Sequence, residues 1–243
     1  MPRRPCPTFE AFAETYLAYS RREHSPSTAR TMRDLVRGKL VPFFRRRRLD
    51  KVDRRAAERL MARHARLSAG TRNRVLSALS AMLEDAVRRG EHHGKPLRGV
   101  PRAREHATPL TWVPLEDQLR LLAELPAAKR PLFVVLLDTG ARLGEVLRIA
   151  WADVTFDPGS ILFRRTKNHR PRIARLTRRA VAALQAHRHA TGGRSKDRAL
   201  VFAAAAGRDG NLRWAWRRPF KEAATRIGHP APVSYTHLTL PTM

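Results

Sequence analysis

Apolar residues in the first ninety positions recur at helical spacing. A first stripe lies in TFEAFAETYLAYS, and its members are Phe9, Phe12, Tyr16 and Leu17. The pair Ser25–Pro26 is typical of a helix start, which predicts a second helix that runs toward Leu40. Both segments therefore predict amphipathic helices with one buried face.

Two further helices are predicted before the pattern stops. Asp53 has the residue type of an N-cap, so we expect a third helix to follow it. The segment TRNRVLSALSAMLEDAVRRG has one wide apolar face and a natural stop at Gly90. Residues 92–109 then lose all periodicity and contain prolines and glycines. We interpret 8–91 as a helical domain and 92–109 as an interdomain linker.

From residue 110 the pattern is first helical and then alternates. Helices are expected from about Leu115, across KRPLFVVLLDTG and across ARLGEVLRIA at 141–150. The stretch ADVTFDPGSILFRRTKNHRPRIARLT alternates with a period of two, which predicts a small antiparallel sheet of two or three strands. Helix is expected again at 178–190 and around 211–227. The predicted fold class is therefore mainly α with a small antiparallel β-sheet, and a second domain covers 110–231.

Charge narrows the class of partner. The 243 residues include 49 lysines and arginines against 21 aspartates and glutamates, a formal charge of +28. Such a surface attracts polyanions, and nucleic acid is the first candidate. GC-rich codon usage explains a preference for arginine over lysine, but it does not explain the basic excess. An RNA-binding protein would need aromatic stacking platforms, and the 7% aromatic residues are not clustered on a predicted strand face.

Other classes of protein and site are disfavoured. A lone cysteine, Cys6, excludes an intrachain disulfide framework and a cysteine-based metal site. His92 and His93 lack a partner cluster, so we expect an exposed pair, with neither a metal nor a cofactor in the protein. The longest apolar run, PLFVVLL, is too short to cross a bilayer, and the N-terminus has no apolar signal-peptide core. We expect a cytoplasmic, nucleoid-associated protein without a membrane partner.

The sharpest chemical pattern is TGARLGEVLRIAWADV. Arg142 is expected in the first turn of a helix after Gly140, where its guanidinium and backbone N–H groups would form a phosphate seat. Glu145 lies on the same helical side and can hold the guanidinium in one rotamer. A simple surface ion pair, worth a few tenths of a kcal/mol, explains the same spacing. Lys167 is expected near a hairpin tip, where it would reach a ligand or be an ordinary loop lysine.

In this order, TGARLGEVLRIAWADV and ILFRRTKNHRPRIARL resemble the tyrosine recombinase (phage integrase) family. TRNRVLSALSAMLEDAVRRGE and LTWVPLEDQLRLL also match that family's layout, so the resemblance covers roughly residues 8–227. It implies a SAM-like core-binding domain, followed by an α+β catalytic domain on the other face of double-stranded DNA. It also implies a tetramer on DNA in the intact protein.

The resemblance implies roles for individual residues. Arg142 would bind the scissile phosphate, Lys167 would donate a proton to the 5′-oxygen leaving group, and Glu145 would support the site. A tyrosine would become linked to the DNA 3′-phosphate. Candidate DNA contacts are Arg72 and Arg74 at the start of the longest N-terminal helix, and His169 and Arg170 beside Lys167.

The last residues depart from the family pattern. A His-x-x-Arg box should follow the hairpin, and the nucleophilic tyrosine should come later. HLTL imitates the box, but Leu240 stands in place of the arginine, and Tyr235 precedes His237. The segment VSYTHLTLPT resembles the translation of a transposase-type sequencing adapter. We therefore expect a non-native tail at 232–243 and a truncated catalytic domain.

Two expectations follow for this chain. The fragment should bind DNA without cutting it, and the alternative is a non-catalytic DNA-binding protein on a recombinase scaffold. Truncation should also leave apolar surface uncovered around three residues, which are Phe133, Val134 and Phe220.

Overall fold

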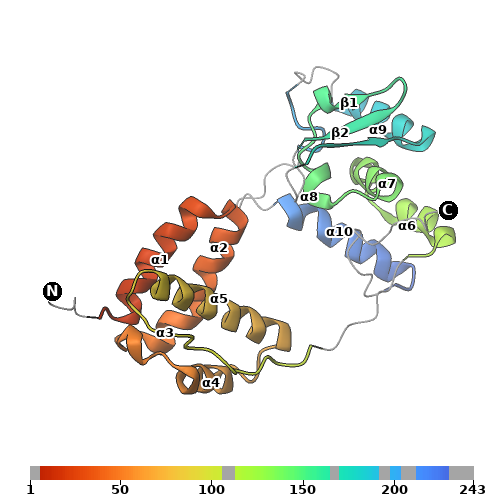
Figure 1. The fold of residues 1–243 in the computed structure, drawn as a ribbon. Helices are drawn as coiled ribbons and strands as arrows, with labels where there is room; N and C mark the ends of the chain where they lie inside the picture. The colour runs from red at the N-terminus through yellow and green to blue at the C-terminus, as the bar shows by residue number, and fades with distance from the viewer. Residues whose placement is uncertain (1–5, 106–112, 165–169, 192–197, 204–211, 230–243) are drawn as a thin grey trace. The chain divides into compact units, whose positions relative to one another are not determined.

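A computed structural model describes residues 6–105, 113–164, 170–191, 198–203 and 212–229. The chain divides into two compact units, residues 1–107 and 108–243 (Figure 1). Each unit has a hydrophobic core of its own. The fold is mainly α with one small antiparallel sheet, which confirms the predicted fold class.

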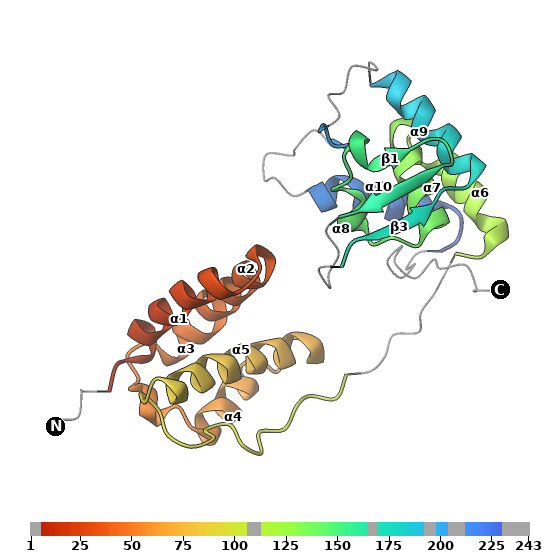
Figure 2. The same cartoon turned by 45° about the horizontal axis from the view of Figure 1, so that its top comes forward.

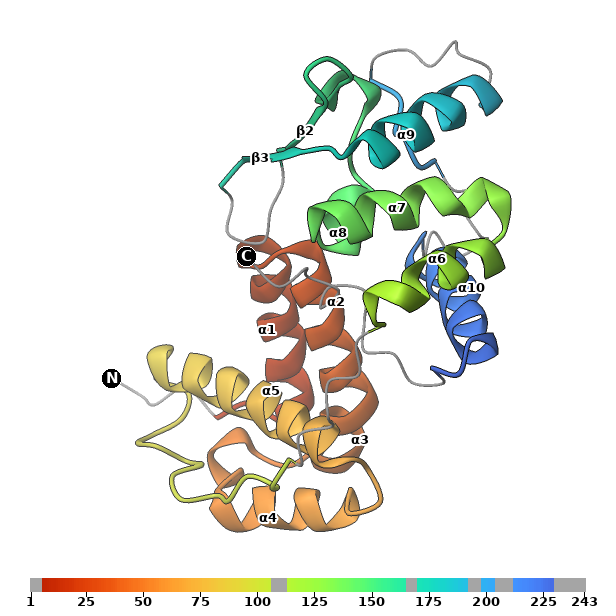
Figure 3. The same ribbon diagram turned by 90° about the vertical axis from the view of Figure 1, so that its right-hand side faces the viewer.

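The regular elements among the described residues of unit 1 are all helical. Its elements are α1 (Phe9–Glu23), α2 (Pro26–Leu35), a π-helical turn (Val36–Leu40), α3 (Val41–Phe44), a 3-10 turn (Leu49–Lys51), α4 (Arg54–Arg63) and α5 (Ala69–Arg88). α1 and α2 lie side by side, and α5 packs against both (Figure 3). All four residues of the predicted first stripe are buried in this core.

The helix starts of unit 1 follow the local sequence. The Ser25 hydroxyl accepts a hydrogen bond from the Thr28 amide at 3.3 Å, and the Asp53 carboxylate accepts one from the Ala56 amide at 2.8 Å. Each side chain thereby satisfies an amide that has no partner within its helix. Both predicted helix starts are confirmed.

Part of the segment predicted as a linker packs on unit 1. Leu97 and Val100 pack against its core. The Asn73 side chain then holds the backbone of Ala103, with its Nδ2 donating to the carbonyl at 2.9 Å and its Oδ1 accepting from the amide at 2.9 Å. We call this segment, residues 97–105, the strap. His92, expected to be exposed, is buried at 7% exposure because the chain folds back after α5.

Unit 2 combines helices and a three-stranded sheet around one hydrophobic core. Its elements are α6 (Leu115–Glu124), a 3-10 turn (Ala127–Lys129), α7 (Arg130–Thr139), α8 (Leu143–Val146), a 3-10 turn (Trp151–Asp153), β1 (Val154–Thr155), β2 (Ser160–Phe163), β3 (Arg172–Arg175), α9 (Arg178–Ala190) and α10 (Leu212–Arg226). The strands are antiparallel in the order β1-β2-β3 (Figure 2). α9 packs against α7.

One predicted helix is much shorter than expected. We predicted helix over 141–150, but α8 ends at Val146. The chain then pairs with a distant segment, since the Val201 amide donates to the Ile149 carbonyl at 2.9 Å and the Trp151 amide to the Ala199 carbonyl at 3.0 Å. Tertiary pairing therefore replaces the last helical turns.

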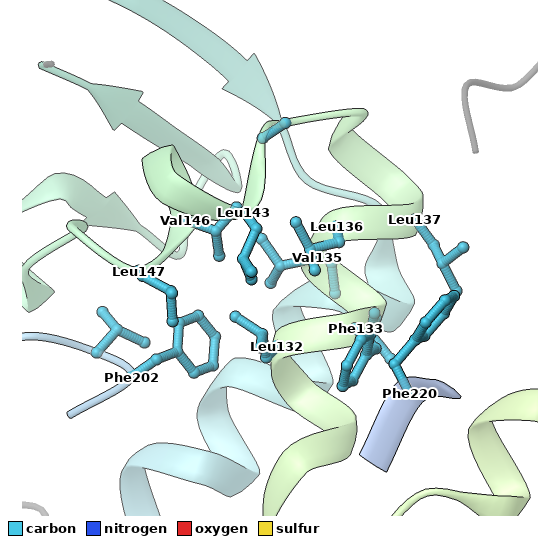
Figure 4. Packing of buried hydrophobic residues seen from close by; sticks show 14 of the residues in the cluster. Leu132, Phe133, Val135, Leu136, Leu137, Leu143, Val146, Leu147, Phe202 and Phe220 are labelled. Atoms are coloured by element: carbon cyan, nitrogen blue, oxygen red, sulfur yellow. The ribbon is translucent and has the colours of Figure 1, made fainter. Parts of the chain in front are cut away.

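The expected exposure of apolar surface in unit 2 is wrong. Phe133, Val134 and Phe220 are 1%, 6% and 3% exposed. The Phe133 and Phe220 rings stack with centroids 5.3 Å apart, so α10 contributes to the core beside α7 (Figure 4). Within the described ranges, no helix is both long and apolar enough to span a bilayer.

Candidate active site

Arg142 lies in the turn between α7 and α8. α7 ends because Gly140 adopts a left-handed conformation with φ of 59°. We predicted Arg142 in the first turn of this helix. It is instead the N-cap of α8. α8 has a single turn of four residues, and the Arg142 amide is taken by the Glu145 carboxylate at 3.2 Å. Because its amide is taken, Arg142 can offer a ligand only the donors of its guanidinium.

Glu145 is the centre of the site. Its side chain is 5% exposed, and one oxygen, Oε1, accepts from Arg142 Nη1 at 3.0 Å. The other oxygen, Oε2, accepts from the Arg142 amide at 3.2 Å and from Arg172 Nη2 at 3.1 Å. A buried carboxylate with three donors differs from the simple surface ion pair that the spacing alone also allowed.

The charge of Glu145 is stabilised by these donors. Burial by itself would raise the pKa of Glu145. The hydrogen bonds from Arg142 and Arg172 outweigh burial and hold the pKa below its usual value. The carboxylate is therefore ionised at neutral pH, and it orients two cations whose side chains are 57% and 39% exposed.

Arg172 is a site residue that sequence reasoning missed. It stands directly opposite Phe163 in the sheet, and its guanidinium carbon lies 4.6 Å from the Phe163 ring centroid. Phe163 is 1% exposed, so this face of β3 turns toward the core. An arginine at an alternating inward position was the signal that could have identified it, because such a charge needs a partner.

A second buried carboxylate lies nearby. Asp153 has a 7% exposed side chain and accepts from Arg164 Nε at 2.5 Å. Its other oxygen accepts from the Ala150 amide at 3.0 Å. Glu145 and Asp153 both line a small pocket of about 80 Å³, which is also lined by Arg148 and Arg164. Arg164 is thus paired with a buried acid, as Arg142 and Arg172 are, and its side chain stays 62% exposed.

The other predicted site residues are placed only in part. Lys167 and His169 lie outside the described residues, and Arg170 is exposed. In unit 1, Arg72 is half-buried, whereas Arg74 is exposed. Arg74 lines a groove of about 330 Å³ between α2 and α5, together with hydroxyl side chains, which are Ser27, Thr28, Thr31 and Ser77. Of these two predicted DNA contacts, Arg74 is thus the more exposed.

Comparisons with known proteins show which proteins this chain is similar to. Residues 115–234 match the model of the phage integrase family. A stretch of 104 residues is 31% identical to the integrase of Escherichia phage P2, and it covers 41% of this chain. It covers 29% of that integrase, so the matched part is under a third of the relative's length.

Two solved structures share the fold. The lambda integrase dimer bound to a COC′ core site has a TM-score of 0.75 at 14% identity, over 95% of this chain and 83% of that chain. The Tn1549 transposon integrase in complex with a circular intermediate DNA has a TM-score of 0.71 at 14% identity, over 95% and 84%.

Proposed function

We propose that this chain, whose residues 115–234 match the phage integrase family model, comes from a site-specific DNA recombinase whose phosphate-binding group is Arg142. The observation that carries this proposal is the buried Glu145, which orients the Arg142 guanidinium while most of that side chain stays exposed. A guanidinium held in one orientation is suited to bind a phosphate through bidentate hydrogen bonds. The proposed partner is double-stranded DNA of the nucleoid.

The proposed reaction is exchange at a DNA phosphodiester. A tyrosine oxygen attacks the phosphorus, the bond to the 5′-oxygen breaks, and a 3′-phosphotyrosyl link forms. Arg142 would neutralise charge that develops on the phosphate oxygens. Lys167 would give its proton to the departing 5′-oxygen. The intact protein would act as a tetramer on DNA.

For the 243-residue chain we propose duplex binding without strand cleavage. Leu240 stands where the family pattern has an arginine, and a leucine cannot bind phosphate. Tyr235 precedes His237, whereas the nucleophile of the pattern follows its box. The second candidate function, a non-catalytic DNA-binding protein, is favoured by the same order of residues. The two candidates differ in whether the native gene encodes a later arginine and tyrosine.

One experiment on the whole chain tests these proposals. Binding to a short fluorescent duplex is measured at several salt concentrations, and a nicked suicide duplex is then used to trap covalent adducts. We expect binding that weakens steeply with salt, because each neutralised phosphate releases counterions. We also expect no adduct on a denaturing gel. Absence of duplex binding contradicts the DNA-binding proposal, and an adduct at Tyr235 contradicts the proposed inactivity.

A further inference from the structure

We propose that Arg172 is a positioning residue, which fixes the Glu145 carboxylate so that Arg142 is held in one orientation for a DNA phosphate. This inference rests on the proposed function, since it takes Arg142 as the phosphate-binding group. It assigns a role to a residue of the β2–β3 hairpin for which the sequence predicted none.

The two oxygens of Glu145 have different partners, and this difference carries the inference. Oε1 receives the Arg142 side chain, whereas Oε2 receives Arg172 Nη2 and the Arg142 amide. Two donors on Oε2 define the plane of the carboxylate, and this plane sets the direction in which Oε1 meets Arg142. Without Arg172, a single long contact of 3.2 Å to the backbone would hold Oε2.

Arg172 is itself held by the core. Its guanidinium lies over the ring of Phe163, with 4.6 Å from the guanidinium carbon to the ring centroid. Phe163 is its direct cross-strand partner and belongs to the core of unit 2. The aromatic ring limits the movement of the guanidinium, and the cation–π attraction favours this position of the Arg172 side chain. A rigid connection thus runs from Phe163 through Arg172 and Glu145 to Arg142.

The same contact joins the two segments that carry the predicted chemistry. Arg172 begins β3, which follows Lys167 in the sequence, and Glu145 lies in α8 next to Arg142. Arg172 and Glu145 are 27 positions apart in the chain. An ion pair between them therefore ties the start of β3 to the turn that bears Arg142. Loss of Arg172 is expected to loosen that tie without removing a group that binds phosphate.

The test compares charge-matched variants of the whole 243-residue chain. Arg172→Met removes the guanidinium but keeps an unbranched stem over Phe163. Arg175→Met is the control, because Arg175 lies on the same strand, is exposed and has no described side-chain partner. Arg172→Lys keeps the charge and loses the planar stack. Inorganic phosphate is the probe, and the side-chain ¹⁵N signals of Arg142 are followed by NMR during its titration.

In the parent chain we expect separate Nη signals for Arg142, because its contact with Glu145 hinders rotation of the guanidinium. In Arg172→Met these signals should merge, and phosphate affinity at Arg142 should fall about tenfold as pre-organisation is lost. Arg175→Met should change the affinity by less than about twofold, since it removes an exposed charge, which is screened by salt. Arg172→Lys should give intermediate values for both measurements.

Two results would overturn the inference. The first is that Arg172→Met and Arg175→Met have the same rate of Arg142 guanidinium rotation and the same phosphate affinity. The other, decisive if Arg172→Met does not fold, is parent-like Arg142 signals in Arg172→Lys. Failure of the proposed function has a different signature. In that case Arg142→Met leaves phosphate affinity unchanged, whatever the rotation measurements show for the Arg172 variants.

Discussion

Glu145 Oε2 and Arg172 Nη2 lie 3.1 Å apart, although 27 residues separate them in the chain. The carboxylate is buried, and it comes from the one-turn helix α8, whereas the arginine begins the edge strand β3. Neither element is long enough to be stable by itself. Their contact therefore contributes to local order as well as to the geometry of Arg142.

Replacing Glu145 by glutamine should destabilise unit 2. The amide loses the charge that both arginines approach, and its NH₂ group cannot accept a hydrogen bond from them. We expect the free energy of unfolding to fall by about 1–2 kcal/mol, measured by urea denaturation. Glu222→Gln is the control, since the exposed Arg218–Glu222 pair should change stability by less than about 1 kcal/mol. Equal effects of the two substitutions contradict the central role of Glu145.

The stability contributed by Glu145 should depend on pH in one direction. Its pKa is lower in the folded protein than its usual value, so the folded state binds protons less readily than the unfolded chain. The contribution is present above the unfolded pKa and is lost as pH falls through the folded pKa. Carboxyl ¹³C NMR should place the Glu145 midpoint below that of exposed glutamates, and Arg172→Met should raise it. A midpoint above the usual value would contradict the three-donor geometry.

Substitution of Asp117 should loosen the end of α10. Its carboxylate contacts His229 Nε2 at 2.9 Å and Arg120 Nη1 at 3.0 Å. Hydrogen bonding from His229, and then from Arg120, lowers the pKa of Asp117 against the opposing effect of burial. Asp117→Asn should increase hydrogen exchange near His229 at neutral pH. This difference between the variant and the parent should shrink as pH falls through the depressed pKa of Asp117, because the parent then also loses its carboxylate charge.

Asn73 should control whether the strap stays on unit 1. Asn73→Ala leaves the Ala103 amide and carbonyl without their side-chain partner, and we expect a loss of about 1–2 kcal/mol. Hydrogen exchange of the Ala103 amide should accelerate. Ser77→Ala is the control, because it removes only the exposed 3.3 Å contact from Arg102. An unchanged exchange rate at Ala103 in the Asn73 variant would show that other contacts hold the strap.

Arg74 should contribute to duplex binding more than a paired arginine does. Arg74→Ala removes an exposed guanidinium from the groove between α2 and α5. The plot of log K against log salt has a negative slope. We expect this slope to become shallower by about 1, as for one lost phosphate contact. The matched control is Arg54→Ala, because Arg54 is already bound to Glu58 at 2.7 Å. Identical slopes for the two variants would place the DNA-contacting surface of unit 1 elsewhere.

Local patterns predicted most of the helices correctly. The Asp53 cap involves Ala56, three residues away, and the buried stripe of α1 involves spacings within a few turns. Such features depend on neighbours along the chain, so residue type and spacing are sufficient to predict them. Arg142 and Glu145 were predicted as a pair for the same reason, because they are three residues apart.

Features that depend on partners far apart in the chain could not be predicted from residue type and spacing. The end of α8 depends on pairing of Ile149 with Val201, the burial of Phe133 depends on Phe220, and the strap depends on Asn73. Arg172 is the same case at the site, because nothing beside it in the chain indicates Glu145 as its partner. The chain's local patterns thus determined the fold class, the helix starts and the pairing of Arg142 with Glu145. Packing brought the second arginine to the buried acid, because a half-buried charge is stable where a non-local contact supplies its counter-ion.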